Sequence, residues 1–221
     1  MTEQALPFES FMSRFVPKDL QSKSSVIYGL ESNYRLAYLN SGWFRFAMKN
    51  GGEPLLSKTW GIGSNVLDAI PEELRSFYRE LFDLGLSAQT APFRPIQHEY
   101  ECPSPSRFRL FLMTLYPIEE VDGLLVVNSL RVSRPHKLSI VSYQDRLETD
   151  YLHTDGNIHQ CLCCRKISHP NEDGRWDFIP EWVEQFHPRA SHGLCGFCTH
   201  HYYKSIDIPP PTFEPPDKNI S

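Results

Sequence analysis

The sequence predicts an α+β protein in which a five-stranded antiparallel sheet carries helices on one face and a small cysteine-rich module follows it. Strand-like and helix-like stretches succeed one another in the order two strands, helices, three strands. Five of the six cysteines then gather within residues 161–198. A single sheet must cover its apolar face, and the intervening helices can do this.

The five expected strands are bounded by turn sequences. The first two, SVIYGLES and YRLAYLN, alternate in polarity and are separated by a turn around residues 31–33. The other three, PIQHEYE, RFRLFLMTLYPI and GLLVVNSLRV, are separated by CPSPS and EEVD, which are typical of turns. The expected strands are residues 25–32, 34–40, 95–101, 107–118 and 123–132.

Two helices are expected between the second and third strands. The stretch SGWFRFAMKNGG places Trp43, Phe44 and Ala47 at helical spacing, and the glycines at 51–52 end the helix. The stretch PEELRSFYRELFDLGLSAQ opens with Pro71 and two glutamates, which is a typical helix start. Both helices have an apolar side with which to cover the sheet.

Composition and charge exclude several classes of protein. The chain has 221 residues, of which 40% are hydrophobic, enough for a compact core. A formal net charge of −5 gives no electrostatic footprint for nucleic acid or for an anionic membrane. The N-terminal sequence lacks a signal-peptide pattern and no apolar run is long enough to cross a bilayer, so we expect a cytoplasmic protein without membrane contact. In that compartment clustered cysteines bind metal more often than they form disulfides.

Changes of composition divide the chain into five expected segments. An N-terminal helical cap is followed by the sheet-forming part, a charged linker, the cysteine-rich segment and a proline-rich tail. Their expected bounds are 1–24, 25–132, 133–157, 158–206 and 207–221.

The cysteines form two CxxC pairs, Cys161 with Cys164 and Cys195 with Cys198. Each CxxC turn can direct two sulfurs at one ion, and two turns complete the tetrahedron of soft ligands that suits zinc. A segment of this size builds little core by itself, so a bound ion would stabilise it. Four thiolates leave no open position for water, and the expected zinc ion is therefore structural.

The segment between the two pairs is expected to fold around the ion, independently of the sheet. The stretch DGRWDFIPEWVEQF suggests a turn at residues 173–174 and a short helix from Pro180. Six apolar side chains are expected to form a miniature core around the metal: Trp176, Phe178, Ile179, Trp182, Val183 and Phe186.

Other readings of the cysteines stay open. Cys163 is adjacent to Cys164 and could replace it as a ligand, and His192 or His201 could replace a sulfur near the second pair. The thiols could also be reduced and buried without metal, form a redox pair, or hold an iron–sulfur cluster. We favour the interpretation that the cysteines bind zinc, because two CxxC pairs among six cysteines rarely arise by chance.

Two parts of the chain resemble known families. The stretches LAYLNSGWFRFAMKNGG, GIGSNVLDAI, RFRLFLMTLYPI and GLLVVNSLRV resemble a PAS sensor domain over residues 25–132. The stretches CLCCRKI and SHGLCGFCTHHYY resemble a small cysteine-paired module that follows PAS domains in bacterial signalling proteins. The resemblance implies a bacterial sensory protein of signal transduction that acts through contacts with a protein partner.

The resemblance also implies a cavity for a small molecule between the sheet and its helices. Solid packing of the same side chains is the alternative. No residue suits a haem or a flavin, and His98 and His136 are expected to be exposed. The candidate lining residues are Tyr38, Trp43, Phe44, Phe77, Leu112 and Asn128, with Phe46, Leu67, Leu110 and Val126 beside them.

No catalytic motif is recognisable, so the protein is not expected to be an enzyme. One alternative is a zinc-ribbon transcriptional regulator that binds nucleic acid, although residues 151–208 hold five basic against seven acidic side chains. Another is a thiol redox protein, which requires that the metal be absent. A homodimer could form through the apolar side of the N-terminal segment, at Phe8, Phe11, Met12 and Phe15.

Overall fold

The computed structural model describes residue 10 and residues 25–87, 95–136, 148–184 and 186–204. The expected N-terminal cap, apart from Ser10, and the expected proline-rich tail lie outside the described residues. Within the described part of the chain, no helix has both the length and the apolar composition needed to cross a bilayer.

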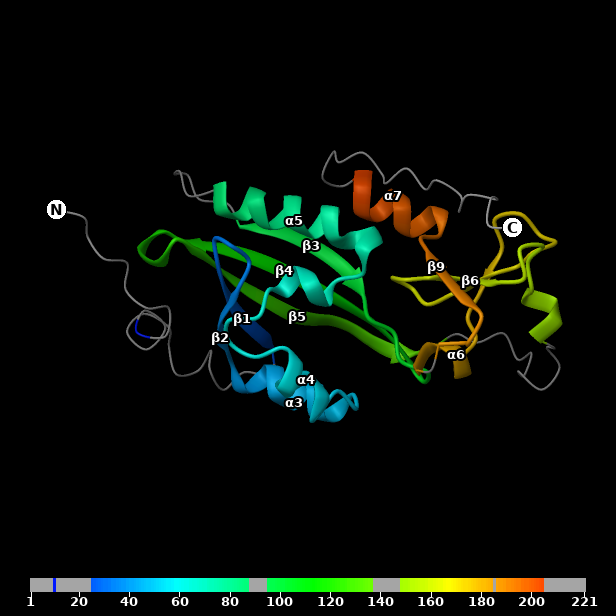
Figure 1. The fold of residues 1–221 in the computed structure, drawn as a ribbon, viewed down its shortest axis with the longest axis horizontal. Helices are drawn as coiled ribbons and strands as arrows, with labels where there is room; N and C mark the ends of the chain where they lie inside the picture. Colours follow the sequence, from blue (N-terminus) through cyan, green and yellow to red (C-terminus); the bar gives the residue numbers. More distant parts are fainter. Residues whose placement is uncertain (1–9, 11–24, 88–94, 137–147, 185, 205–221) are drawn as a thin grey trace, which may run out of the picture.

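The first part of the chain forms a five-stranded antiparallel sheet with the order β2-β1-β5-β4-β3 (Figure 1). The expected α+β fold with a five-stranded antiparallel sheet is thereby confirmed. Strand β5 runs past the expected end at residue 132, because Pro135 still pairs with Arg107 of β4. The strands are β1 (Val26–Glu31), β2 (Leu36–Leu39), β3 (Ile96–Glu101), β4 (Arg107–Ile118) and β5 (Gly123–Pro135).

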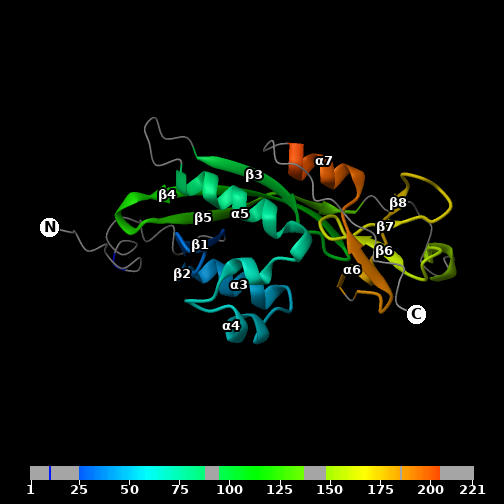
Figure 2. The ribbon, with the colours of Figure 1, turned by 45° about the horizontal axis from the view of Figure 1, so that its top comes forward.

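Helices α3 and α5 cover one face of this sheet (Figure 2). Phe46 of α3 contacts Phe111 of β4 edge-to-face, with ring centroids 5.7 Å apart. Gly85 lets α5 approach the sheet, since a Cβ there would lie 3.1 Å from side-chain atoms of Leu115 and Leu124. The elements between β2 and β3 are α3 (Ser41–Lys49), α4 (Leu55–Thr59), the 3-10 turn η1 (Val66–Ala69) and α5 (Glu72–Ser87).

Asn40 fixes the start of α3 against the sheet. Its side-chain oxygen accepts hydrogen bonds from the backbone N–H of Trp43, as an N-cap does, and from that of Ile27 on β1, both at 3.0 Å. Its amide nitrogen donates to the carbonyl of Ser25 at 3.0 Å. Gly42 makes the close approach possible, because a Cβ at this position would lie 2.1 Å from the Ser25 carbonyl oxygen.

The last part of the chain forms a second, four-stranded sheet with the order β8-β7-β6-β9, in which β6 and β9 are parallel. A 3-10 turn, η4, precedes it, and the expected short helix after Pro180 is present as α6. We call residues 25–136 the sheet domain and residues 148–204 the cysteine module. The elements of the cysteine module are η4 (Glu148–Tyr151), β6 (Ile158–Cys161), β7 (Ile167–Ser168), β8 (Trp176–Asp177), α6 (Glu181–Glu184), β9 (Ala190–Gly193) and α7 (Gly196–Lys204).

The expected linker over residues 133–157 is corrected at both ends. Its first residues belong to β5. At its other end, Tyr151 is buried in a core with Ile158, Ile167 and Trp182 of the cysteine module. Tyr151 also donates a hydrogen bond to Asp177 at 3.0 Å. The cysteine module therefore begins before residue 158, because its core needs this aromatic side chain.

The cysteine module and the sheet domain share a core. Helix α7 lies beside the end of α5 in both views (Figures 1 and 2), where Phe77 packs edge-to-face on Tyr202 with centroids 5.1 Å apart. The Tyr203 hydroxyl donates to the Glu73 carbonyl at 2.8 Å, and His201 Nε2 donates to the Glu99 carbonyl at 2.7 Å. The two parts are therefore in direct contact, and whether the cysteine module folds independently stays a prediction.

Candidate metal centre

The first CxxC turn follows strand β6. Cys161 is the last residue of the strand, and its carbonyl accepts a hydrogen bond from the Arg165 N–H at 3.0 Å, which closes the turn. The Cys161 N–H donates to the Lys166 carbonyl at 2.8 Å. Arg165 adopts a left-handed φ of 62°, which returns the chain toward β7 directly after Cys164. The turn thus leaves both sulfurs on its inner side.

The second CxxC turn opens helix α7. Cys195 immediately precedes the helix, and its carbonyl accepts the Thr199 N–H at 2.9 Å. The two turns meet because β6 and β9 are parallel neighbours, with Cys161 in register with Gly193. Parallel strands need a long crossover, and the segment between the two cysteine pairs supplies it through β7, β8 and α6.

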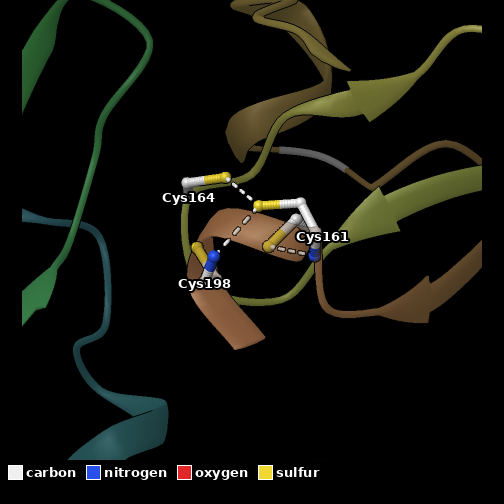
Figure 3. A group of neighbouring side chains, drawn as sticks. Cys161, Cys164 and Cys198 are labelled. Carbon is white, nitrogen blue, oxygen red and sulfur yellow. Dashed lines mark hydrogen bonds between the residues drawn. The ribbon is translucent and has the colours of Figure 1, made fainter. Parts of the chain in front are cut away.

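The four sulfurs of Cys161, Cys164, Cys195 and Cys198 converge on one point, and all lie within 4.8 Å of one another. Figure 3 shows Cys161 and Cys164 on one segment and Cys198 on the facing helix. The sulfurs of Cys164 and Cys195 are 3.8 Å apart. Four sulfurs at about 2.3 Å from a tetrahedral zinc ion would be about 3.8 Å apart, so this separation fits a metal–thiolate site.

The surroundings favour the thiolate form at Cys161 and Cys195, whereas the neighbouring sulfurs raise the pKa of Cys164 and Cys198. The N–H of Cys195 donates to the Cys161 sulfur, and the N–H of Cys198 donates to the Cys195 sulfur, both at 3.4 Å. Hydrogen bonds from the thiols of Cys163 and Cys164 lower the pKa of Cys161 far below its usual range. Since all four side chains are buried, a bound ion would have no open position, and the cluster suits a structural metal rather than a catalytic one.

The three alternative ligands lie outside this group of four. Cys163 is buried beside it, but its sulfur does not belong to the cluster. His201 contacts the Glu99 carbonyl, and the ring of His192 packs on Phe186 with centroids 4.8 Å apart. The structure thus groups the sulfurs that the CxxC spacing selects.

The expected miniature core divides into separate parts. Ile179 and Trp182 are buried with Tyr151, away from the cysteines. Trp176 instead packs on the shared core that contains the cysteines, and Phe186 is 47% exposed. Tyr202 and Tyr203 of α7 are buried in the same shared core as the cysteines.

A cavity of about 520 Å³ lies next to the cysteine cluster, between the sheet and helices α3 and α5. Of the six residues expected to line such a cavity, Trp43 and Asn128 do so. Asn128 accepts a hydrogen bond from Tyr100 at 2.9 Å. Phe46 also lines the cavity, whereas Leu67, Leu110 and Val126 do not.

Four of the expected lining residues lie elsewhere. Tyr38 packs with the apolar cluster on the opposite face of the sheet, and Leu112 is on that face because strand neighbours alternate. Phe44 follows Trp43 on α3 and is 41% exposed. Phe77 is fully buried, but at the junction with α7.

The expectation that His98 is exposed is wrong, since only 4% of its surface is exposed. It lies on β3 beneath the junction, with its ring 4.8 Å from those of Phe77 and Tyr202. Desolvation lowers the pKa of His98 to about 3, and the neighbouring His201 acts in the same direction. Sequence alternation could have placed His98 on the inner face, but α7, which covers it, comes a hundred residues later.

The sequence reasoning missed that the cysteine module forms part of the cavity wall. Leu162, Cys163, Arg165 and Tyr202 all line the cavity. The first three belong to the first CxxC turn or directly follow it, so their proximity to the metal could be predicted from the sequence. Their position against the sheet domain was not, because it depends on how the two parts pack.

No family model matches the chain. The chain is 30% identical over 130 residues, 54% of its length, to the "Uncharacterized 104.1 kDa protein in hypE 3'region" of Rhodobacter capsulatus. The match spans 13% of the length of that relative.

Proposed function

We propose that this chain is a cytoplasmic, PAS-type sensory protein of bacterial signal transduction, which acts through contacts with a protein partner and carries a structural zinc ion. The observation that carries the proposal is the sheet of order β2-β1-β5-β4-β3, with helices on one face and a cavity beneath them. This arrangement agrees with the sequence resemblance over residues 25–132. A cavity of this volume is within the range of small-molecule sites, which supports a sensory role.

Zinc is the metal we propose for Cys161, Cys164, Cys195 and Cys198. Four thiolates select soft or borderline metals, and tetrahedral sulfur sites are typical of zinc or of iron–sulfur clusters. The separation of 3.8 Å between the sulfurs of Cys164 and Cys195 supports a single ion. The short CxxC spacing, with both turns closing on one point, favours zinc.

Two exposed apolar side chains are candidate points of contact with a protein partner. Phe197 of α7 has 71% of its surface exposed, and Met48 of α3 has 70%. Apolar side chains scattered singly on a surface are ordinary, so the two positions are candidate contact points and the proposal of a partner rests on the sequence resemblance. We propose a signalling protein, or a second copy of this chain, as the partner.

The two alternative functions have less support. The cysteine module carries more acidic than basic side chains, which disfavours binding to phosphates. A redox function needs an accessible thiol, and all five cysteines of the module are buried. Neither alternative is favoured by an observation of its own.

The metal and the oligomeric state are tested together by native mass spectrometry after purification under reducing, chelator-free conditions. We expect one zinc ion per chain. The mass also reports whether the protein is a homodimer and whether a small molecule accompanies it. A protein without metal, or with iron and sulfide, contradicts the zinc proposal.

The signalling role is tested by a photo-crosslinking amino acid placed at Phe197 or Met48 in cells. We expect crosslinks to one protein partner or to a second copy of the chain. The same group at Lys58 and at Glu80, which are exposed and charged, provides the control. Equal yields at all four positions would contradict a specific contact, and DNA binding by the purified protein that weakens between two salt concentrations would favour the regulator instead.

A further inference from the structure

Both the sheet domain and the cysteine module line the cavity beside the metal cluster. Most of the lining residues belong to the sheet domain, and many of them are aromatic. The cysteine module closes the cavity with Leu162, Cys163, Arg165 and Tyr202. The aromatic residues of the sheet domain that line it are Tyr28, Trp43, Phe46, Tyr78, Phe82, Tyr100 and Phe111. Such walls suit a flat, apolar molecule.

Two residues that line this cavity, Trp43 and Arg165, each carry a buried hydrogen-bond donor without an acceptor. Neither the indole Nε1 of Trp43 nor Nη1 of Arg165 has a hydrogen-bond partner within the described part of the chain. An indole N–H and a guanidinium can only donate, and a buried donor without a partner costs about 1–3 kcal/mol. A ligand that offers oxygen acceptors would remove this cost.

The charge of Arg165 specifies the ligand further. Its guanidinium packs over the ring of Phe186, with Cζ 4.7 Å from the centroid, and stacking on its face leaves the unpartnered Nη1 at its edge available to an anion. Glu101 also lines the cavity, but burial raises the pKa of this carboxyl above its usual value, with Lys166 acting the other way. Lys166 and Arg134 also oppose the negative charge that Glu101 would present to an anion.

We propose that this cavity binds a small aromatic carboxylic acid, whose carboxylate pairs with Arg165, and that its binding is coupled to the metal centre. The inference rests on the zinc centre of the proposed function. Arg165 directly follows Cys164, and the backbone of the CxxC turn sets its position through the hydrogen bond to Cys161. Loss of the ion would release the turn and, with it, the group that pairs with the acid.

Coupling of this kind is reciprocal. If the ion favours the turn that binds the acid, the acid must favour retention of the ion by the same factor. The cavity and the metal would then act as one site with two ligands, and the acid would be the molecule that the sensory protein detects. Because Tyr202 packs on Phe77 of α5, a movement of the cysteine module on binding would act directly on α5.

The first experiment measures the preference for an acid. Full-length, zinc-loaded protein is titrated with benzoate, phenylacetate and indole-3-acetate, each beside its neutral amide, and followed by ligand-observed NMR. We expect at least one acid to bind about tenfold more tightly than its amide. Arg165→Gln should abolish this preference, whereas Arg79→Gln, an exposed change on α5 outside the cavity, should keep it.

A variant that blocks the cavity tests whether the acid binds there. Ala69 lines the cavity but is itself exposed, so Ala69→Trp adds bulk at the rim without filling a packed core. We expect it to weaken the acid and the amide alike. Acid binding that persists unchanged in Ala69→Trp and in Arg165→Gln would overturn the assignment of this site.

The second experiment measures the coupling through zinc release to a chromogenic chelator. A saturating concentration of the preferred acid should slow release about threefold or more in the wild-type protein and in Arg79→Gln, but not in Arg165→Gln. A release rate that does not respond to a bound acid overturns the coupling.

The outcomes separate this inference from the proposed function. A protein that holds one zinc ion but binds none of the three acids at millimolar concentration overturns the inference and leaves the zinc centre in place. A protein without zinc contradicts the zinc centre and the coupling, while the comparison of acid with amide still decides the role of Arg165.

Discussion

The rings of Phe77 and Tyr202 lie 5.1 Å apart with their planes at 63°, and this contact joins helix α5 of the sheet domain to helix α7 of the cysteine module. Both side chains are buried. Cys198 lies on the same helix as Tyr202, four residues earlier. The metal cluster is therefore one helical turn from the core of the sheet domain.

The first prediction compares two aromatic residues of α7. Tyr202→Ala removes a buried side chain at the junction and should lower the free energy of unfolding by about 3–5 kcal/mol. Phe197→Ala is the matched control, because Phe197 is largely exposed on the same helix and its loss should change stability by about 0.5 kcal/mol or less. Urea unfolding measures both. Equal effects of the two variants would contradict a shared core.

Metal removal should destabilise the whole described structure and not the cysteine module alone. A strong chelator frees the turns that hold α7, and α7 covers Phe77 and His98. We expect thermal unfolding in one transition at a lower temperature, measured by calorimetry. The opposite result would be a high-temperature transition that chelation leaves unchanged, as an independent sheet domain would give.

Cysteine-to-serine variants identify the ligands. Changes at Cys161, Cys164, Cys195 or Cys198 should each release zinc, because the cluster loses one of four soft ligands. Cys163→Ser is the matched control and should retain about one zinc per chain, measured by elemental analysis. Loss of zinc in Cys163→Ser together with retention in Cys164→Ser would show that the first turn binds through the other cysteine.

Gly42 should tolerate no side chain. In Gly42→Ala the new Cβ would lie 2.1 Å from the Ser25 carbonyl oxygen, so either α3 or the chain before β1 must move. We expect a loss of about 1–3 kcal/mol of stability. Gly193→Ala is the control, since nothing lies within 4 Å of its Cβ position. Chemical denaturation that finds the two variants alike would contradict the tight packing of α3.

His98 should make the protein less stable as the pH falls. Its pKa is about 3 in the folded protein against 6.5 for an ordinary histidine, so the unfolded chain binds the proton first. The stability present above pH 6.5 is lost as the pH falls toward 3, and this amounts to about 2 kcal/mol between pH 7.5 and pH 5. His98→Phe should reduce the pH dependence of urea unfolding by this amount. An unchanged pH dependence would indicate that His98 is not buried as a neutral group.

The local features of this protein could be predicted from its sequence. Alternation and turn residues locate five strands, because a strand with one buried face must repeat every second residue. The spacing within each CxxC pair selects Cys161, Cys164, Cys195 and Cys198, because two sulfurs three residues apart in one turn face the same point. Periodicity also distinguishes Trp43, which lines the cavity, as part of the inner side of α3.

Only the tertiary structure decided what covers each face. Tyr38 and Leu112 are apolar strand residues like those of the cavity, but alternation does not reveal which face the helices cover. His98 is buried by a helix that is distant in sequence, and Arg165 lines the cavity because the cysteine module packs against the sheet domain. Short-range spacing determines the ligands of one ion, whereas burial and the cavity depend on contacts between residues far apart in the chain, which no local pattern encodes.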